Sequence, residues 1–122
     1  MNKARTIFAS AAVTASGDSG VIDNSDAFAG NFVFDITALT GTTPTVTFTV
    51  EGIDSQSGKA YTILASAALS AVATTVLKVG PSLTAAANLV ANDHLPKQFR
   101  VKWVITGTTP SITFSVGASL RS

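Results

Sequence analysis

The only histidine of the chain, His94, stands next to Asp93, and a carboxylate beside an imidazole can orient it for general-base catalysis. A nucleophile, a base and an orienting group must also meet in a pocket, and no motif in the sequence marks one. The chain has no cysteine, so one subunit cannot assemble a transition-metal site of ordinary composition or a thiolate nucleophile. We therefore expect no catalytic residue, and a loop position for His94 at a surface or an interface.

Two groups of acidic residues could in principle serve a ligand. Asp35 and Glu51 fall on the threonine-bearing faces of strands expected to pair, so they could lie close together, as the carboxylates of a glycoside hydrolase do. The segment from Asp18 to Asp26 offers three aspartates and an asparagine as oxygen ligands for Ca²⁺, but the spacing matches no calcium-binding loop. We expect solvated side chains and Asx turns at these positions, hence no metal and no cofactor.

Basic and aromatic residues alternate from Lys97 to Trp103, a pattern that a nucleic-acid-binding strand could use by stacking bases on its rings. In a strand, however, Phe99 and Trp103 point to the face opposite Arg100 and Lys102, so rings and charges cannot serve one ligand. We expect the rings in the core. Arg100 and Lys102 then form an outward basic stripe that could pair with a carboxylate of a neighbouring subunit.

Charge and composition limit the partners that the chain can attract. Eight basic and seven acidic residues give a formal net charge of +1, and only 12% of the residues are charged. A nearly neutral chain has no general electrostatic attraction for nucleic acid or for an anionic membrane. Alanine, threonine and serine dominate, so much of the surface must be hydroxyl and methyl. Such a sparsely charged surface is typically covered by a partner.

Length and hydropathy favour a single domain without a membrane segment. At 122 residues the chain can bury a core without a disulfide or a metal. The start of the chain, from Met1 to Ala15, faintly resembles a signal peptide, but serine and threonine interrupt its apolar stretch and we expect it to be retained. The uncharged run from Ala60 to Leu77 is long enough to span a bilayer, but polar residues dilute it and we reject that interpretation.

The strongest pattern is an internal repeat. Thr40–Val50 recurs as Thr106–Val116, with eight identities and three conservative changes in eleven positions. The first threonine of each copy is followed by Gly-Thr-Thr-Pro, which is typical of a turn, because glycine tolerates positive φ and proline fixes its own φ. Apolar and hydroxyl residues alternate after each turn, and apolar residues also alternate before it, at Phe32–Ala38 and Phe99–Ile105. We therefore expect each copy to be a hairpin.

Turn signals divide the rest of the chain into short strands. Asp54–Lys59 is a polar connection with a glycine where positive φ is needed, Gly80-Pro81 ends a strand, and Ser82–Asn92 has the spacing of a short helical turn. The expected strands are Thr6–Thr14, Val21–Phe28, Asn31–Leu39, Thr45–Ile53, Ala60–Ser66, Thr74–Val79, Lys97–Ile105 and Ser111–Leu120.

Seven or eight strands without βαβ alternation predict an all-β fold, an antiparallel two-layer β-sandwich that is jelly-roll-like and contains a duplicated hairpin. Within this single domain, residues 1–16 form an N-terminal arm and first strand, and residues 17–122 form the β-sandwich proper.

Four features together resemble the small virion proteins of tailed bacteriophages. They are Gly17–Gly20, Phe34–Ala38, the two Gly-Thr-Thr-Pro strands, and Gly80–Asn88. The likeness covers most of the chain from Gly17 onward, and is greatest to the head decoration, or cement, proteins on the outside of the capsid. The resemblance implies a non-enzymatic structural protein that stabilises the capsid exterior of the virion after synthesis in the host cytoplasm. Its partners would be the major capsid protein and further copies of itself, with a trimer favoured.

By this interpretation the mechanism is interfacial, and repetition over the capsid lattice turns weak single contacts into avidity. The arm of residues 1–16 is the candidate for reaching a neighbour, with Ile7 and Phe8 as anchors. A tail or baseplate accessory protein is the alternative within virions. A carbohydrate-binding β-sandwich module is the alternative outside them, and Tyr61 is its candidate aromatic, because Trp103 is assigned to the core.

Overall fold

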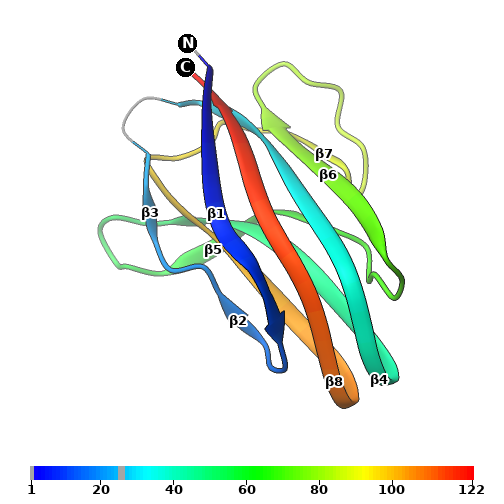
Figure 1. Ribbon diagram of the computed structural model, residues 1–122. Coiled ribbons are helices and arrows are strands. Elements are labelled where there is room, and N and C mark those ends of the chain that lie inside the picture. The colour runs from blue at the N-terminus through cyan, green and yellow to red at the C-terminus, as the bar shows by residue number, and fades with distance from the viewer. Residues whose placement is uncertain (1, 25–26) are drawn as a thin grey trace.

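The structure is a computed structural model that describes residues 2–24 and 27–122 (Figure 1). The all-β prediction is confirmed: 70% of the chain is strand, the described residues contain no helix, and eight strands join in one sheet. No described helix is therefore present that could span a membrane. The strands are β1 (Asn2–Val13), β2 (Gly17–Asp18), β3 (Ile22–Asp23), β4 (Ala29–Ile53), β5 (Ala60–Ala65), β6 (Ala73–Gly80), β7 (Val90–Asn92) and β8 (Gln98–Arg121).

The two long strands, β4 and β8, contain the repeat and form the centre of the sheet. They pair antiparallel almost from end to end, from Ala29 opposite Arg121 to Gly52 opposite Phe99. The register shifts between Ile36 and Ala38 and at two places around the Gly-Thr-Thr-Pro segments. Buried residues alternate with less buried ones along the first half of β4 and both halves of β8, whereas residues 48–52 of β4 are all buried. The period-2 pattern of the sequence therefore corresponds to strands that bury one face.

The prediction that each repeat copy is a hairpin is wrong. Residues 29–40 of β4 pair with residues 111–121 of β8, and residues 45–52 of β4 pair with residues 99–106 of β8. Each long strand instead turns back on itself, so that Phe34 and Phe48, both in β4, stack with their ring centroids 4.4 Å apart. A flat hairpin would leave the apolar faces of its two arms uncovered. Folding the strand back brings these two faces together in one core.

The two Gly-Thr-Thr-Pro turns lie side by side at the lower end of the molecule in Figure 1. They share positive φ at equivalent positions, Gly41 and Thr43 in the first copy and Gly107 and Thr109 in the second. Thr42 pairs with Thr108, and the hydroxyl groups of Thr45 and Thr106 share a hydrogen bond. The two copies of the repeat therefore occupy equivalent environments.

Shorter strands extend the sheet on both sides of this centre. The order is β1-β8-β4-β6-β7, with β2 and β3 also pairing with β8 and β5 with β4. The predicted turn at Asp54–Lys59 is confirmed, with Gly58 at φ +75°, as is the end of a strand at Gly80. All pairs are antiparallel except that of β6 with β7.

The helical turn predicted at Ser82–Asn92 is wrong. Val90–Asn92 forms β7, parallel to the end of β6, and positive φ at Ser82 and Asn88 is incompatible with a helix. Lys78 N donates to Leu89 O at 2.9 Å, so the edge of β6 provides a hydrogen-bond partner for the residue before β7. Alanine has a high helix propensity, but three alanines offer little surface to bury, and pairing with a neighbouring strand prevails.

The core lies between the two halves of the folded sheet. Phe32, Phe34, Phe48, Phe99 and Phe114 are fully buried. Trp103 is 5% exposed and meets Phe114 edge to face at 5.3 Å. The prediction that the rings of residues 99–103 belong to the core is confirmed.

Candidate interaction surfaces

The residues with catalytic potential do not converge, and Glu51 is buried, so the expectation that its side chain is solvated is wrong. His94 lies in the loop after β7, as expected, and its Nδ1 is 3.2 Å from Asp93 Oδ1 with both side chains exposed. Asp35 accepts a hydrogen bond from the Thr74 hydroxyl, whereas Glu51 lies in the other half of β4 and binds Arg100. Among the residues that the structure describes, no three histidine, aspartate or glutamate side chains converge as a metal site would require.

The acidic segment between β2 and β4 is built from Asx turns. Asp18 Oδ1 accepts the backbone N–H of Gly20 at 2.8 Å. Asn24 is buried, accepts the N–H of Ala27 at 3.0 Å and donates to the Ala27 carbonyl at 2.7 Å. Asp26, the last of the possible calcium ligands, lies outside the described residues. The expected Asx turn is present at Asp18, and Asn24 also binds nearby backbone, but Asn24 is buried and not solvated as expected.

Arg100 is paired within its own chain. Its Nε donates to Glu51 Oε1 at 2.7 Å, and its Nη1 lies 3.6 Å from Asp18 Oδ2. The hydrogen bond to Glu51 raises the pKa of the guanidinium above its ordinary value. Arg100 and Lys102 do lie on the face opposite the rings, as expected. The expected carboxylate partner of Arg100 is therefore Glu51 of the same chain, which lies directly opposite Arg100 in the pairing of β4 with β8, and not a residue of a neighbouring subunit.

Ile7 and Phe8, the expected anchors, lie on β1, which pairs with the second half of β8. Both side chains are half-buried and pack against the core of their own chain. The centroid of the Phe8 ring lies 4.7 Å from the centroid of the Trp103 ring and 5.2 Å from that of the Phe114 ring. These two residues therefore hold β1 on the body of the protein.

The outer edge of β1 has no partner strand among the described residues, because β1 is the last strand on its side of the sheet. Its charges, Lys3 and Arg5, are near the beginning, and the residues from Thr6 to Val13 carry none. Two register shifts interrupt its pairing with β8, on either side of Phe8. A long edge with unpaired backbone groups and few charges is a template for adding another strand.

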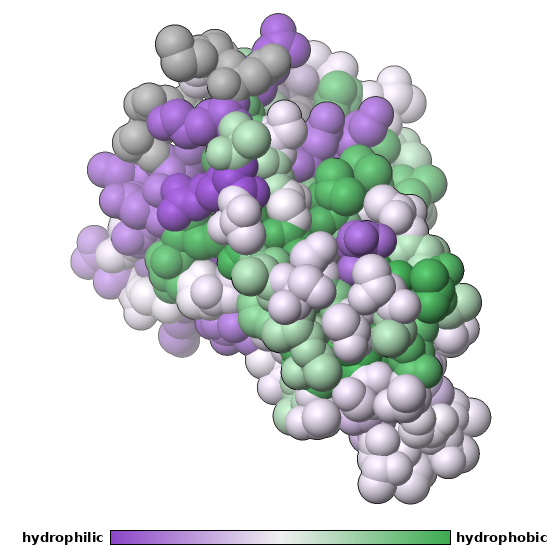
Figure 2. All heavy atoms as spheres, in the orientation of Figure 1, coloured by the Kyte–Doolittle hydropathy of each residue, from purple (hydrophilic) through white to green (hydrophobic). Residues whose placement is uncertain are grey.

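A grid of nine residues, which we call the outer patch, covers neighbouring parts of β6, β4 and β8. Its three cross-strand rows follow from the strand register: Thr74–Asp35–Ser115, Val76–Val33–Gly117 and Lys78–Asn31–Ser119. These residues alternate with the buried ones and therefore point away from the core. Figure 2 shows this side of the molecule, where hydrophilic side chains gather toward the upper end and apolar or small residues occupy the middle.

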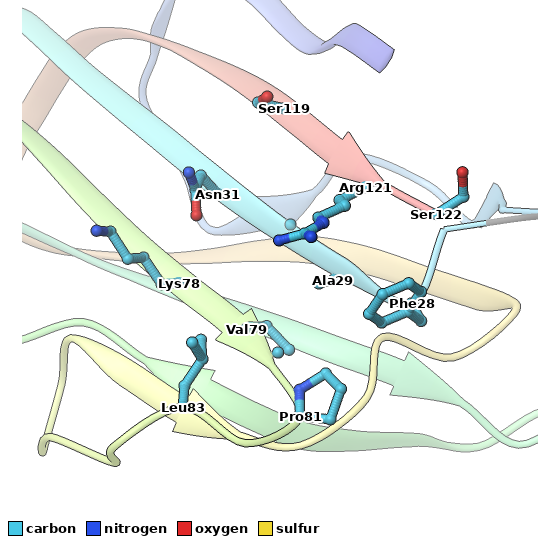
Figure 3. A pocket seen from close by; sticks show the side chains of 12 residues that line it. Phe28, Ala29, Asn31, Lys78, Val79, Pro81, Leu83, Ser119, Arg121 and Ser122 are labelled. Atoms are coloured by element: carbon cyan, nitrogen blue, oxygen red, sulfur yellow. The ribbon is translucent and has the colours of Figure 1, made fainter. Parts of the chain in front are cut away.

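A hollow of about 740 Å³ opens at the upper end of the outer patch (Figure 3). Lys78, Asn31 and Arg121 line it from three neighbouring strands, and the apolar side chains of Phe28 and Leu83 form its other walls. Ser119 and Ser122 also contribute. No described carboxylate side chain forms an ion pair with Lys78 or Arg121.

A second hollow, of about 480 Å³, lies beside Tyr61 at the turn between β4 and β5. Tyr61 is 45% exposed, and its ring lies so close to Gly52 that a Cβ there would be 2.4 Å from it. Asp23, Asp54 and Gln98 are also in the lining. The ring is thus held against the backbone, next to polar groups that can accept or donate hydrogen bonds.

With this geometry established, comparison with known proteins finds no relative: no family model, no curated protein and no solved structure matches the chain.

Proposed function

We propose that this protein is a structural component of a tailed-phage virion that decorates and stabilises the outer capsid surface through contacts with the major capsid protein. The proposal depends above all on the free edge of β1. A monomer in solution would expose this edge to other chains, and natural proteins usually protect such edges with charges or cover them. Strand addition by a capsid subunit would satisfy the backbone groups of the edge.

The proposal also concerns how the sheet is arranged in layers. We propose that the folded sheet is a two-layer β-sandwich with jelly-roll-like connections. Its support is that the ring of Phe48, in the second half of β4, contacts both Phe34 and Phe114, which belong to the other halves of the long strands. Two layers packed on one rigid core suit a protein that must resist deformation while bound to a capsid.

The contact energy need not be large at any one site. Only 12% of the residues are charged, and a sparsely charged surface is suited to burial against a partner. A homo-oligomer that binds several capsid subunits at once would convert modest contacts into high occupancy. The localisation that follows from this proposal is the capsid exterior.

The test is co-sedimentation of the purified protein with capsids of the phage that encodes it, followed by imaging of the particles. Ser10→Lys/Ala12→Lys adds charge to the exposed middle of β1 and leaves Ile7 and Phe8 intact. We expect at least tenfold lower occupancy for this variant, and wild-type occupancy for Ser70→Lys in an exposed loop. Absence of wild-type binding, or density on the tail or baseplate instead of the head, would contradict the proposal. Undiminished binding of the β1 variant would reject the role of the edge.

A carbohydrate-binding module is the second candidate, because of the hollow beside Tyr61. Sugars stack on exposed aromatic rings and form hydrogen bonds with carboxylates and amides, and Tyr61, Asp23, Asp54 and Gln98 supply these groups in one place. The Tyr61 hydroxyl has no hydrogen-bond partner among the described residues, so it remains available to a ligand.

A glycan array tests this second candidate. If the hollow binds sugar, Tyr61→Ala should lose the glycans that the wild type retains, whereas Tyr61→Phe should keep most of them because the stacking ring remains. A wild-type protein that retains no glycan on the array would exclude the carbohydrate-binding function.

A further inference from the structure

The two charged residues of the outer patch stand at its opposite ends. Asp35 is in the first row and Lys78 is in the third, four residues apart along the strands, a separation of about 13 Å. This is too far for an ion pair within one chain. Neither residue has an ion-pair partner among the described residues. The patch therefore presents a negative end, where Asp35 accepts a hydrogen bond from Thr74, and a positive end at Lys78, with no ion pair among the described residues at either end.

We propose that the outer patch is a self-association surface, on which a second copy of this chain docks face to face. The two-fold axis would run along the central row, Val76–Val33–Gly117, in the plane of the interface. Such an axis reverses the strand direction and keeps each strand opposite its equivalent. The first row of one copy then faces the third row of the other.

This arrangement places complementary groups across the interface. Asn31 of one copy lies over Asp35 of the other, so its amide can donate to the carboxylate. Lys78 lies over Thr74 of the second copy, one strand away from Asp35, and strands are about 4.8 Å apart. The long lysine side chain can span that distance to form an ion pair. Because of the two-fold symmetry, each contact is made twice. Figure 3 shows Lys78 and Asn31 adjacent on β6 and β4.

The alternative two-fold axis, along β4, is disfavoured by the same charges. It keeps each row opposite itself, and so places Asp35 directly against Asp35 of the second copy. Like charges in juxtaposition across an interface oppose association. The charge pattern therefore selects one of the two face-to-face arrangements.

The central row permits close approach of the two sheets. Packed sheets lie about 10 Å apart, with side chains filling the space between them. Gly117 adds no side chain, and a Cβ built there meets no atom within 4 Å. Val33 and Val76 supply apolar surface on either side of the axis, and Val76 is 38% exposed in the single chain. Burial of these valines would contribute to association.

This inference shares with the proposed function only the expectation that the chain forms a homo-oligomer. Face-to-face docking uses the outer surface of the sheet and leaves the free edge of β1 for the capsid. A two-fold contact is compatible with a trimer only when two trimers combine in D3 symmetry. The assembly should therefore contain an even number of chains.

Reversing the charges at Asp35 and Lys78 tests this docking, with the dissociation constant of the assembly measured by analytical ultracentrifugation. Asp35→Lys and Lys78→Asp should each raise the dissociation constant at least tenfold, because each places like charges across the interface. The double variant Asp35→Lys/Lys78→Asp reverses both ends, and should associate within about threefold of the wild type. Lys59→Asp makes the same charge change in the turn after β4 and should have no effect.

A steric variant supplies an independent measurement. Gly117→Tyr places a large ring on the axis at a position with open space in the single chain, so it should block association without unfolding the protein. Thermal melting of each variant confirms that it is folded. A wild type that stays monomeric, an assembly with an odd number of chains, or a double variant that is not rescued would overturn this inference. Capsid co-sedimentation is measured separately, so failure of self-association and failure of capsid binding are distinguishable.

Discussion

Gly41 and Gly107 each lie against the turn that contains the other. A Cβ on Gly41 would be 2.6 Å from the Thr109 carbonyl oxygen, and one on Gly107 would be 2.9 Å from the carbonyl oxygens of Thr42 and Thr43. Real Cβ atoms do not approach backbone this closely. Glycine is therefore required in both copies of Gly-Thr-Thr-Pro for two reasons. The turn needs positive φ at this position, and the backbone of the other copy leaves no room for a Cβ.

Gly107→Ala should consequently destabilise the protein by about 2–4 kcal/mol, from the unfavourable φ and the backbone clash together. Gly58→Ala is the matched control, because Gly58 also has positive φ but a Cβ there meets no atom within 4 Å. It should cost only about 1 kcal/mol. Urea denaturation measures both changes in the free energy of unfolding. Equal losses for the two variants would show that contact between the turns contributes nothing.

Phe8→Ala should loosen β1 and expose Trp103. The half-buried Phe8 ring packs on Trp103 and Phe114, so its removal should lower the free energy of unfolding by about 2 kcal/mol, less than the 3–5 kcal/mol typical of a fully buried phenylalanine. Iodide should then quench Trp103 fluorescence more strongly than in the wild type. Phe28→Ala, which removes an exposed ring with no aromatic contact among those described, should leave quenching unchanged. Wild-type quenching of the Phe8 variant would contradict the packing.

Arg100 interacts with two carboxylates of unequal importance. Glu51 has a side chain that is 8% exposed and a hydrogen bond of 2.7 Å, so Glu51→Gln should cost about 2 kcal/mol of stability. Asp18 is more exposed and lies 3.6 Å away, so Asp18→Asn should cost less than about 0.5 kcal/mol. Chemical denaturation measures both. A larger loss for Asp18→Asn would mean that this pair, and not the buried one, stabilises the β2 contact.

The contribution of the Asp54 carboxylate to the stability of the fold should be lost in acid. The Ser57 hydroxyl, and then the backbone N–H groups of Gln56 and Ser57, lower the pKa of the Asp54 carboxyl by hydrogen bonding to its charged form. Because the folded pKa lies below the unfolded one, this contribution to stability is complete above about pH 4 and disappears as the pH falls through the folded value.

Carbon-13 NMR titration of the Asp54 carboxyl measures this shift. Ser57→Ala should raise the pKa toward its ordinary value, since it removes the largest cause of the shift. Ser55→Ala alters the same turn without removing a described hydrogen bond to Asp54 and should leave the pKa unchanged. Identical titrations in all three proteins would contradict the role of the Ser57 hydroxyl.

The partners of Arg100 illustrate what a pattern of side chains can and cannot predict. Alternation placed Arg100 outside and Trp103 inside, and both positions are correct. The same alternation could not identify Glu51 as the partner of Arg100, because that depends on which strand lies alongside. The face-to-face relation of Phe34 and Phe48 was missed for the same reason.

The sequence by itself determined the all-β class, most strand positions, the turns at the glycines and the aromatic core, because local φ preferences and period-2 alternation are properties of neighbouring residues. Only the tertiary structure decided that each half of β4 pairs with a half of β8 and not with the other half of β4. It also decided that Val90–Asn92 is a strand, and that Asp35 and Lys78 lie on one surface, the outer patch. Backbone hydrogen bonds are chemically the same for every strand. The choice of partner is therefore made by the packing of whole apolar faces, a property that no single stretch of residues carries.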